Sequence, residues 1–483
     1  MTLSTVGSGL TKINADKEKL GLHYVGLMLV LAWYYCLWFV PGVIRWSGLL
    51  EFANILSWLA NLGASGFFLL ILPLFMKKGR LFENQAQSNY VLSIGLCICT
   101  LIFTMVTPVW QHFSLYGVLF PLILGFLNAS LWLLWGELHG RRHSKFTIEK
   151  IAPVFAVVMG VFLLVSYVLP APFDSIFVSC IPLLAMAAFK KETESLPEKA
   201  TIPPLLPEKP RKNAMFSMAI ICITISGCCA ACYYNIAIIP IEFLPEEGKG
   251  YVWGVFASAV LLLMIGLAYK RMVNNSSIYQ LIPWLMAACV ISISLYATQD
   301  TFLYCASFEI SVALCGVFEI LIIMYFGSLS SKGYLAPSFA FGLSSGCVRI
   351  GFLVGNSIAV LEETLGVVDT FGQPLALGFI CMLALIIIPH IRQEQNITGL
   401  TVNNNSTYEI DDICDSVIKE FGLSTREGEI IRLIAKGYTV DSISKKLYIS
   451  PYTTQTHVRH IYAKMQIHKR SELLDYINMH RSE

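Results

Sequence analysis

Residues 190–213 read KKETESLPEKATIPPLLPEKPRKN, a stretch rich in proline and in charged side chains. This composition predicts an extended linker. On both sides of it lie apolar runs of about 20 residues, the length that crosses ~30 Å of hydrocarbon. We expect six runs before it, near 22–44, 50–75, 89–109, 113–136, 149–169 and 171–189, and six after it, near 214–240, 250–269, 279–298, 301–326, 334–360 and 371–390.

The overall composition agrees with a membrane location. Of the 483 residues, 14% are Asp, Glu, Lys or Arg, against roughly 25% in an average soluble protein. A chain that is apolar over residues 1–390 cannot hide this surface in water, so a soluble enzyme, a disordered chain and a disulfide-built secreted domain are excluded. The sequence predicts an all-α, polytopic membrane domain over 21–390, followed by a soluble tail.

The distribution of Lys and Arg predicts the orientation of the spans. If residues 1–20 are cytoplasmic, the inner segments contain twenty Lys and Arg and the outer loops contain two, Arg45 and Lys249. An even number of spans then places the tail in the cytoplasm, and 190–213 becomes a central cytoplasmic loop. We therefore expect a multi-pass protein of the cell membrane with both termini cytoplasmic.

Six spans, a long cytoplasmic linker and six more spans resemble the major facilitator superfamily (MFS), whose two halves are parallel repeats. The resemblance covers about residues 20–390 and depends on the layout of the spans. That family has a G-x-x-x-D-R-x-G-R-like loop between spans two and three. Here the loop reads MKKGRLFENQ (76–85), with Gly79 and Arg80 but no Asp before them. This departure argues against active transport.

Charged residues inside predicted spans are candidates for ligand sensing, because a charge at bilayer depth is costly unless it is paired or hydrated. With span midpoints near 313 and 347 and ~1.5 Å rise per residue, Glu309 lies ~6 Å outside the centre, Arg349 ~3 Å outside and Glu319 ~9 Å inside. The closer depth match is therefore Glu309–Arg349, while the long side chain of Arg349 leaves the deeper Glu319 open as a partner. Such a pair either holds the helices in register or opens so that Arg349 binds an anion. Asn128 is a softer candidate, which lines a cavity or joins helices.

The composition changes again after Arg392. Residues 391–414 are polar and turn-rich and are expected to form a linker, and residues 415–483 show the apolar period of four short helices. Ser424 with Glu427 forms a capping box that opens the first helix. Ser450 followed by Pro451 caps the third, which is expected to bury Thr454, Val458, Ile461 and Met465. The arrangement suits a helix-turn-helix whose third helix enters the DNA major groove.

The residue order in the tail is more specific than a helix-turn-helix pattern. The segments LSTREGEIIRLIAKG (423–437), ISKKLYIS (443–450), TTQTHVRHIYAKM (453–465) and KRSEL (469–473) resemble the LuxR-type DNA-binding domain. We expect its DNA-binding residues to be Tyr452, Thr453, Gln455, Thr456, Arg459, His460, Lys464, Lys469 and Arg470.

The resemblance implies a role for several of these positions. Gln455, Thr456 and Arg459 would face base edges, and Lys464, Lys469 and Arg470 would lie near phosphates. Arg426 and Glu427 would form the family's internal pair. Gln455 replaces the family's usual Lys, and an amide suits adenine. The fourth helix, near 470–480, is the expected dimer contact through Leu473 and Ile477.

These observations predict a bacterial membrane-bound transcription regulator that senses a small molecule, and not an enzyme. One alternative is an MFS-type transporter with a regulatory DNA-binding tail, and another is a tail that serves only as a tether. The expected partners are promoter DNA, the lipid bilayer, an unidentified small-molecule ligand and a second copy of the chain on DNA, with RNA polymerase a further candidate. No cofactor and no metal are expected, since His457 and His460 have no carboxylate or Cys at ligand spacing.

Overall fold

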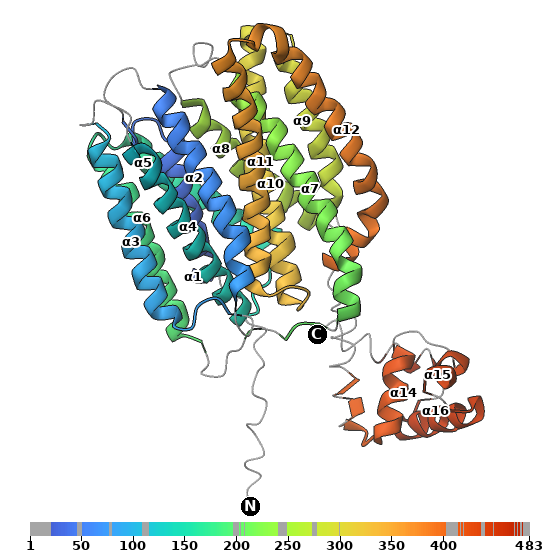
Figure 1. Cartoon of the computed structure of the whole chain (residues 1–483). Coiled ribbons are helices and arrows are strands. Elements are labelled where there is room, and N and C mark those ends of the chain that lie inside the picture. Colours follow the sequence, from blue (N-terminus) through green and yellow to red (C-terminus); the bar gives the residue numbers. More distant parts are fainter. Residues whose placement is uncertain are drawn as a thin grey trace, which may run out of the picture. The chain divides into compact units, whose positions relative to one another are not determined.

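The computed structural model describes residues 21–45, 51–76, 80–108, 115–196, 202–239 without 203 and 207, 249–272, 278–298, 300–401 and, with short gaps, 414–476. Contacts between Cα atoms divide the chain into two compact units, 1–401 and 402–483. The described residues of both units are mainly helical, as the sequence predicts (Figure 1).

The first unit contains twelve long helices. The first six are α1 (Leu22–Phe39), α2 (Glu51–Ile71), α3 (Gln85–Val106), α4 (Leu115–Arg141), α5 (Ile148–Val168) and α6 (Phe173–Glu194). The second six are α7 (Glu208–Ile238), α8 (Lys249–Met272), α9 (Ile282–Tyr296), α10 (Thr301–Ser331), α11 (Pro337–Leu365) and α12 (Val368–Thr401). Short 3₁₀ turns extend α2 (η1, Leu72–Phe75) and precede α9 (η3, Ile278–Leu281). Within the described residues, twelve helices are long and apolar enough to cross a membrane, the ninth as α9 together with η3, so the prediction of twelve spans is confirmed.

Helix packing repeats between the two halves. In the first half α1 packs against α5 and α6, α2 against α4, and α3 against α4 and α6; in the second half α7 packs against α11 and α12, α8 against α10, and α9 against α10 and α12. The halves meet mainly where α2 contacts α11 and α5 contacts α8 (Figure 1). Helices α2 and α5 of the first half correspond to α8 and α11 of the second, so the two interfaces between the halves are equivalent. The membrane domain is therefore an internal repeat with approximate twofold symmetry.

The last membrane helix is longer than the sequence predicts. Residues 391–401, which were expected to belong to the linker, continue α12 as far as Thr401. The apolar run ends near 390 because the helix no longer needs an apolar surface beyond that depth, and not because the helix ends. The extension is held by buried Ile397 and Thr398 and by a hydrogen bond from Lys332 Nζ to Leu400 O of 2.8 Å.

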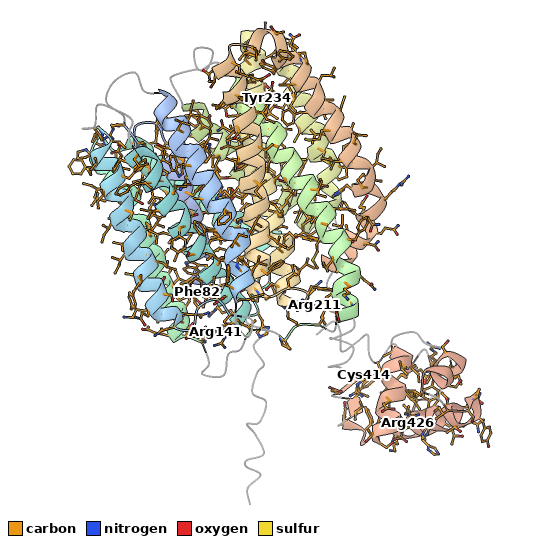
Figure 2. The ribbon with its side chains drawn as sticks, in the orientation of Figure 1. Phe82, Arg141, Arg211, Tyr234, Cys414 and Arg426 are labelled. Atoms are coloured by element: carbon orange, nitrogen blue, oxygen red, sulfur yellow. The ribbon has the colours of Figure 1, made fainter. Side chains whose placement is uncertain are left out.

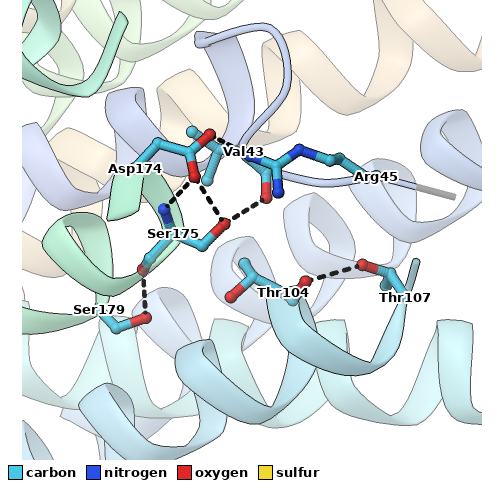
Figure 3. A network of polar contacts seen from close by, with 7 residues as sticks. All are labelled: Val43, Arg45, Thr104, Thr107, Asp174, Ser175 and Ser179. Atoms are coloured by element: carbon cyan, nitrogen blue, oxygen red, sulfur yellow. Dashed lines mark hydrogen bonds and ion pairs between the residues drawn. The ribbon is translucent and has the colours of Figure 1, made fainter. Parts of the chain in front are cut away.

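Polar contacts tie the connections together at both ends of the bundle. At one end Arg142 forms an ion pair with Glu192 at 2.7 Å, and Figure 2 places Arg141 and Arg211 at this end and Tyr234 at the other. At the other end Arg45 pairs with Asp174, and Ser175 Oγ donates to Val43 O at 3.1 Å (Figure 3). Arg45, one of the two basic residues expected in outer loops, is thus neutralised by a carboxylate on α6.

The second unit has its own small hydrophobic core. Its described helices include α14 (Thr425–Ala435), α15 (Val440–Leu447) and α16 (Pro451–Met465), and α16 packs against both of the others. The buried core residues are Cys414, Val417, Leu423, Ile430, Ile431, Ile434, Ile443, Val458, Ile461, Met465 and Leu473. Most of the predicted fourth helix, including Ile477, lies outside the described residues.

Candidate DNA-binding surface and membrane-domain cavity

The helix that would read DNA is fixed at its start by a cap and along its length by the core. Ser450 Oγ accepts the backbone N–H of Thr453 at 2.9 Å, and Pro451 occupies the first turn, where a missing N–H costs no helical hydrogen bond. The four residues predicted to be buried, Thr454, Val458, Ile461 and Met465, are all buried. The opposite face of α16 is therefore fixed toward solvent.

The predicted DNA-binding side chains lie mostly on that exposed face. Tyr452 is 78% exposed, and Thr453, Gln455, Arg459 and His460 are exposed as well. Thr456 is half-buried, and its Oγ1 donates to Tyr452 O at 3.0 Å. Beyond the helix, Lys469 is exposed and Arg470 is half-buried. A contiguous polar face with an arginine, an amide and hydroxyls can hydrogen-bond to base edges and phosphates.

Lys464 makes contacts within the domain. Its Nζ forms an ion pair with Glu427 Oε2 at 2.7 Å and donates to Gly422 O at 3.1 Å. Glu427 also accepts the backbone N–H of Ser424 at 2.7 Å, which closes the predicted capping box. Burial opposes ionisation of Glu427, but the hydrogen bonds from Lys464 and Ser424 outweigh it and lower its pKa from 4.5 to about 2. Lys464 therefore joins α16 to the start of α14.

The expected internal pair of Arg426 with Glu427 is wrong. Arg426 instead pairs with Glu429 at 2.5 Å and donates to Leu447 O at 2.9 Å, which ties α14 to the end of α15. Neighbouring residues on a helix point about 100° apart, whereas positions i and i+3 share a face. The predicted dimer contact at Leu473 is wrong as well, because this side chain is buried in the core of its own domain.

Inside the membrane domain, Arg349 of α11 and Glu319 of α10 form a buried ion pair. Nη2 of Arg349 lies 3.3 Å from Glu319 Oε1, and the two side chains are 4% and 0% exposed. Two tyrosines of α1 complete the cluster: Tyr35 donates to Glu319 Oε2 at 2.6 Å, and Arg349 Cζ lies 3.5 Å from the centre of the Tyr34 ring. The cluster therefore joins α1, of the first half, to α10 and α11 of the second.

The predicted pairing of Arg349 with Glu309 is wrong. Glu309 is half-buried and faces α8, where a Cβ built on Gly254 would lie 3.2 Å from its Oε2. The closer match in depth did not decide the partner, because the long arginine side chain reaches inward to the deeper carboxylate of Glu319. Asn128 is buried on α4, and nearby Asn61 donates to Pro121 O at 3.0 Å, a contact that joins α2 to α4.

A cavity of about 300 Å³ lies next to this cluster, between helices of both halves. Its walls are mainly aromatic and aliphatic: the lining residues include Trp38, Phe39, Trp58, Tyr233, Tyr251, Phe308, Asn356, Val360 and Glu363. Arg349, Glu319, Glu309 and Asn128 do not line it. Tyr35, Phe39, Tyr233 and Phe352 surround a much smaller void of about 10 Å³, a layer next to the ion pair.

Sequence reasoning did not find this cavity. Its aromatic residues come from α1, α2, α7, α8 and α10, and aromatic side chains in apolar spans are too frequent to single out any subset. Tyr34 and Tyr35 give a weak signal, since two adjacent phenol groups in the first span need partners at membrane depth. Among the described residues, no group of three or more His, Cys, Asp or Glu is arranged to hold a metal ion.

Together these features define a multi-pass membrane protein with a C-terminal helix-turn-helix domain. Residues 422–477 match the family described as bacterial regulatory proteins, luxR family, so the chain carries a LuxR-type DNA-binding regulator domain. The tail is similar to an HTH-type transcriptional regulator of Mycobacterium tuberculosis H37Rv, with 40% identity over 53 residues, 11% of this chain and 6% of that one. It is also similar to the oxygen regulatory protein NreC of Staphylococcus haemolyticus, with 44% identity over 54 residues, 11% of this chain and 25% of NreC.

A longer alignment reaches NreC of Staphylococcus carnosus, with 33% identity over 107 residues, 19% of this chain and 49% of that one. The chain thus spans at most about half the length of these relatives. Among solved structures, the human organic anion transporter MFSD10 (TETRAN) is similar with a TM-score of 0.48 and 13% identity, over 77% of this chain and 97% of that one. The curated matches point to a DNA-binding regulator, not to an enzyme.

Proposed function

We propose that this protein is a membrane-bound, sequence-specific transcription regulator that senses a small molecule through its membrane domain. The observation that carries the proposal is that one chain contains both a membrane domain with a cavity and a DNA-binding domain. A twelve-span domain with a 300 Å³ cavity between its halves is followed by a LuxR-type domain whose α16 exposes Gln455, Arg459 and His460.

The DNA-binding domain is cytoplasmic in this proposal. The positive-inside bias of twenty Lys and Arg against two and the even number of spans support this orientation. Promoter DNA is then reached from the membrane, with the DNA-binding domain attached through the segment that follows α12. Membrane attachment limits the search to DNA near the bilayer, so a weakly binding domain gains from a high local concentration.

DNA binding starts at α16. Gln455, Thr456 and Arg459 contact base edges, and Lys469 and Arg470 contact phosphates. Residues 415–483 contain 11 Lys and Arg against 8 Asp and Glu, so the electrostatic attraction of one domain to DNA is small. Two tails on an inverted repeat compensate for this, and we propose that the regulator acts as a dimer on DNA.

Sensing works through a population shift of the membrane domain. A ligand in the cavity contacts α1 and α2 of one half and α7, α8, α10 and α11 of the other, so it binds the arrangement of halves seen here better than any other arrangement. The Tyr35–Glu319–Arg349 cluster, which also crosses between halves, holds this arrangement in place. The state of the halves then decides whether two tails can pair on DNA.

The test is genome-wide capture of DNA by the intact protein in its native membrane, beside a variant in which Gln455, Thr456 and Arg459 are all replaced by Ala. We expect sharp peaks that the variant loses. A matched control replaces the exposed Glu194 of α6 by Gln and should keep every peak. Absence of peaks for the abundant wild-type protein, with and without candidate inducers, would contradict the proposal.

A second candidate function is transport with a regulatory tail, and the cavity at the junction of the halves favours it. It predicts uptake of a labelled compound by proteoliposomes, with loss of uptake when the cavity residue Trp58 is replaced by Ala. DNA capture without any uptake would favour a sensing membrane domain over a transporting one. Uptake together with capture would support a transporter that reports its own occupancy.

A further inference from the structure

The walls of the membrane-domain cavity identify the kind of ligand that fits it. Of the lining residues, six are aromatic, from five different helices: Trp38, Phe39, Trp58, Tyr233, Tyr251 and Phe308. Several form a continuous series, with ring centres 5.4 Å apart for Trp38–Trp58 and 6.2 Å apart for the stacked Trp58–Tyr233 pair. Ring faces carry partial negative charge, so such a surface attracts cations as well as apolar groups.

The polar groups of the cavity lie on one face of α11. Asn356 and Glu363 both line it, and they are about 10 Å apart along the helix axis at ~1.5 Å per residue. Asn356 is buried and lines the cavity, so its amide can hydrogen-bond to a ligand there. Glu363 is exposed, as expected for a residue near the C-terminal end of α11 and the mouth of the cavity.

The charge on the lining of the cavity is negative. Glu363 is the charged residue among the described residues that line it, and no described Lys, Arg or His belongs to this lining. The buried cation next to the cavity, Arg349, is paired with Glu319 and lies behind the aromatic layer of Tyr35, Phe39, Tyr233 and Phe352. An anionic ligand would therefore lose its hydration without meeting a positive charge, which is costly in an apolar cavity.

We propose that the cavity binds a hydrophobic organic cation, with its apolar part against the aromatic walls, its positive charge on ring faces and toward Glu363, and a hydrogen bond to Asn356. This assignment rests on the proposed sensing function, because it names the class of the sensed molecule. It excludes an anionic ligand, which the sequence analysis considered for Arg349.

The test uses three probes of nearly the same shape on the full-length protein in nanodiscs. Phenyltrimethylammonium carries the charge, tert-butylbenzene is its neutral isostere, and benzoate is an anion of similar size. Binding is followed by the fluorescence of Trp38 and Trp58, with a Trp58→Phe variant to assign the signal to the cavity. We expect the cation to bind about tenfold or more tightly than its neutral isostere, the advantage expected from aromatic faces and one carboxylate, and benzoate to bind most weakly.

Variants separate the contributions. Glu363→Gln should weaken binding of the cation severalfold and leave tert-butylbenzene unchanged, and Glu194→Gln, an exposed carboxylate at the other end of the bundle, should change neither. Equal binding of cation and neutral isostere, or tighter binding of benzoate, would overturn the assignment. DNA capture is measured in parallel: if the cation binds as expected but does not alter capture, the cavity assignment stands and the sensing function fails.

Discussion

The ammonium group of Lys332 donates a hydrogen bond of 2.8 Å to the carbonyl oxygen of Leu400. Lys332 ends α10, and Leu400 lies in the last turn of α12, immediately before the residues that lead to the DNA-binding domain. Burial lowers the pKa of Lys332 from 10.5 to about 8, so the group is still charged at neutral pH and the hydrogen bond is charge-assisted. The contact therefore joins the end of α10 to the last turn of α12.

Replacement of Lys332 by Met should uncouple sensing from DNA binding. Met keeps most of the apolar side chain but cannot donate to Leu400, so the end of α12 no longer follows α10. We expect genome-wide DNA capture to persist but to lose its response to a ligand. Lys190→Met, at an exposed lysine of α6, is the matched control. A ligand response that survives in the Lys332 variant would show that coupling takes another route.

The Arg349–Glu319 pair predicts a double-mutant cycle. Each single replacement, Arg349→Met or Glu319→Leu, leaves one buried charge without its partner, which costs about 3–5 kcal/mol. The double variant removes both charges and should recover most of the loss. Thermal unfolding of the purified protein in detergent measures these effects. If the two single losses simply add in the double variant, the residues do not act as a pair.

Tyr35 gives a finer test of the same cluster. Its hydroxyl donates to Glu319 at 2.6 Å, so Tyr35→Phe removes one hydrogen bond to a charged acceptor, a loss of about 1.5–3 kcal/mol. In the Glu319→Leu background the same replacement should cost little. The melting temperatures of the wild type, the two single variants and the double variant measure this difference. An equal effect of Tyr35→Phe in both backgrounds would assign Tyr35 a packing role instead.

The sequence was informative where local rules decide the structure. The span count followed from apolar length, and the buried face of α16 followed from the helical period, so Thr454, Val458, Ile461 and Met465 were all predicted correctly. The capping box at Ser424 and Glu427 is likewise a local pattern, and both of its hydrogen bonds are present, at 2.7 Å and 3.4 Å. These features need no knowledge of which helices are neighbours.

Sequence reasoning failed where partners come from distant segments. Glu319 accepts a hydrogen bond from Tyr35, which lies 284 residues away in the sequence. The depth of each residue along its own helix could not identify this contact or the partner of Arg349. The contact of the Lys464 ammonium with Glu427, 37 residues earlier, was likewise not predicted, and the assignment of Lys464 to a phosphate stays a prediction. The cavity is lined by six helices from both halves, and only the three-dimensional arrangement brings together its aromatic side chains, which come from five of them.

The pKa of Glu427 makes the stability of the DNA-binding domain depend on pH. The folded pKa, about 2, is below the ordinary value of 4.5, so the unfolded state binds the proton first as the pH falls. The stabilisation is therefore complete above pH 4.5 and is lost as the pH falls toward 2. Residues 402–483 form a compact unit with their own core, so urea unfolding of this fragment measures the effect.

Glu427→Gln should reduce the free energy of unfolding at pH 7 by about 1.5–3 kcal/mol, the range for a hydrogen bond to a charged group. The variant should also lose less stability than the wild type between pH 4.5 and 2. Glu420→Gln, at an exposed carboxylate that contacts Tyr476 at 3.2 Å, should change stability by less than about 0.5 kcal/mol. Parallel pH profiles for wild type and Glu427→Gln would contradict the role of the Lys464 contact.

Two lysines that the sequence places together near phosphates should behave differently on DNA. Lys469 is exposed, and its replacement by Met should reduce the slope of log K against log salt by about 1 without altering sequence preference. Lys464 already binds Glu427 and Gly422, so Lys464→Met should mainly lower the stability of the domain and leave that slope nearly unchanged.

Arg459→Ala provides the third comparison, since its side chain is exposed on α16 at a position assigned to a base edge. Its loss should cost about 1–3 kcal/mol of specific binding and relax sequence preference at one position. Fluorescence anisotropy with specific and scrambled duplexes, over a range of salt concentrations, measures all three variants. If Lys464→Met reduces the salt slope as much as Lys469→Met does, then Lys464 also contacts a phosphate when DNA binds, through its third N–H or after leaving Glu427, and its role is not confined to the stability of the domain.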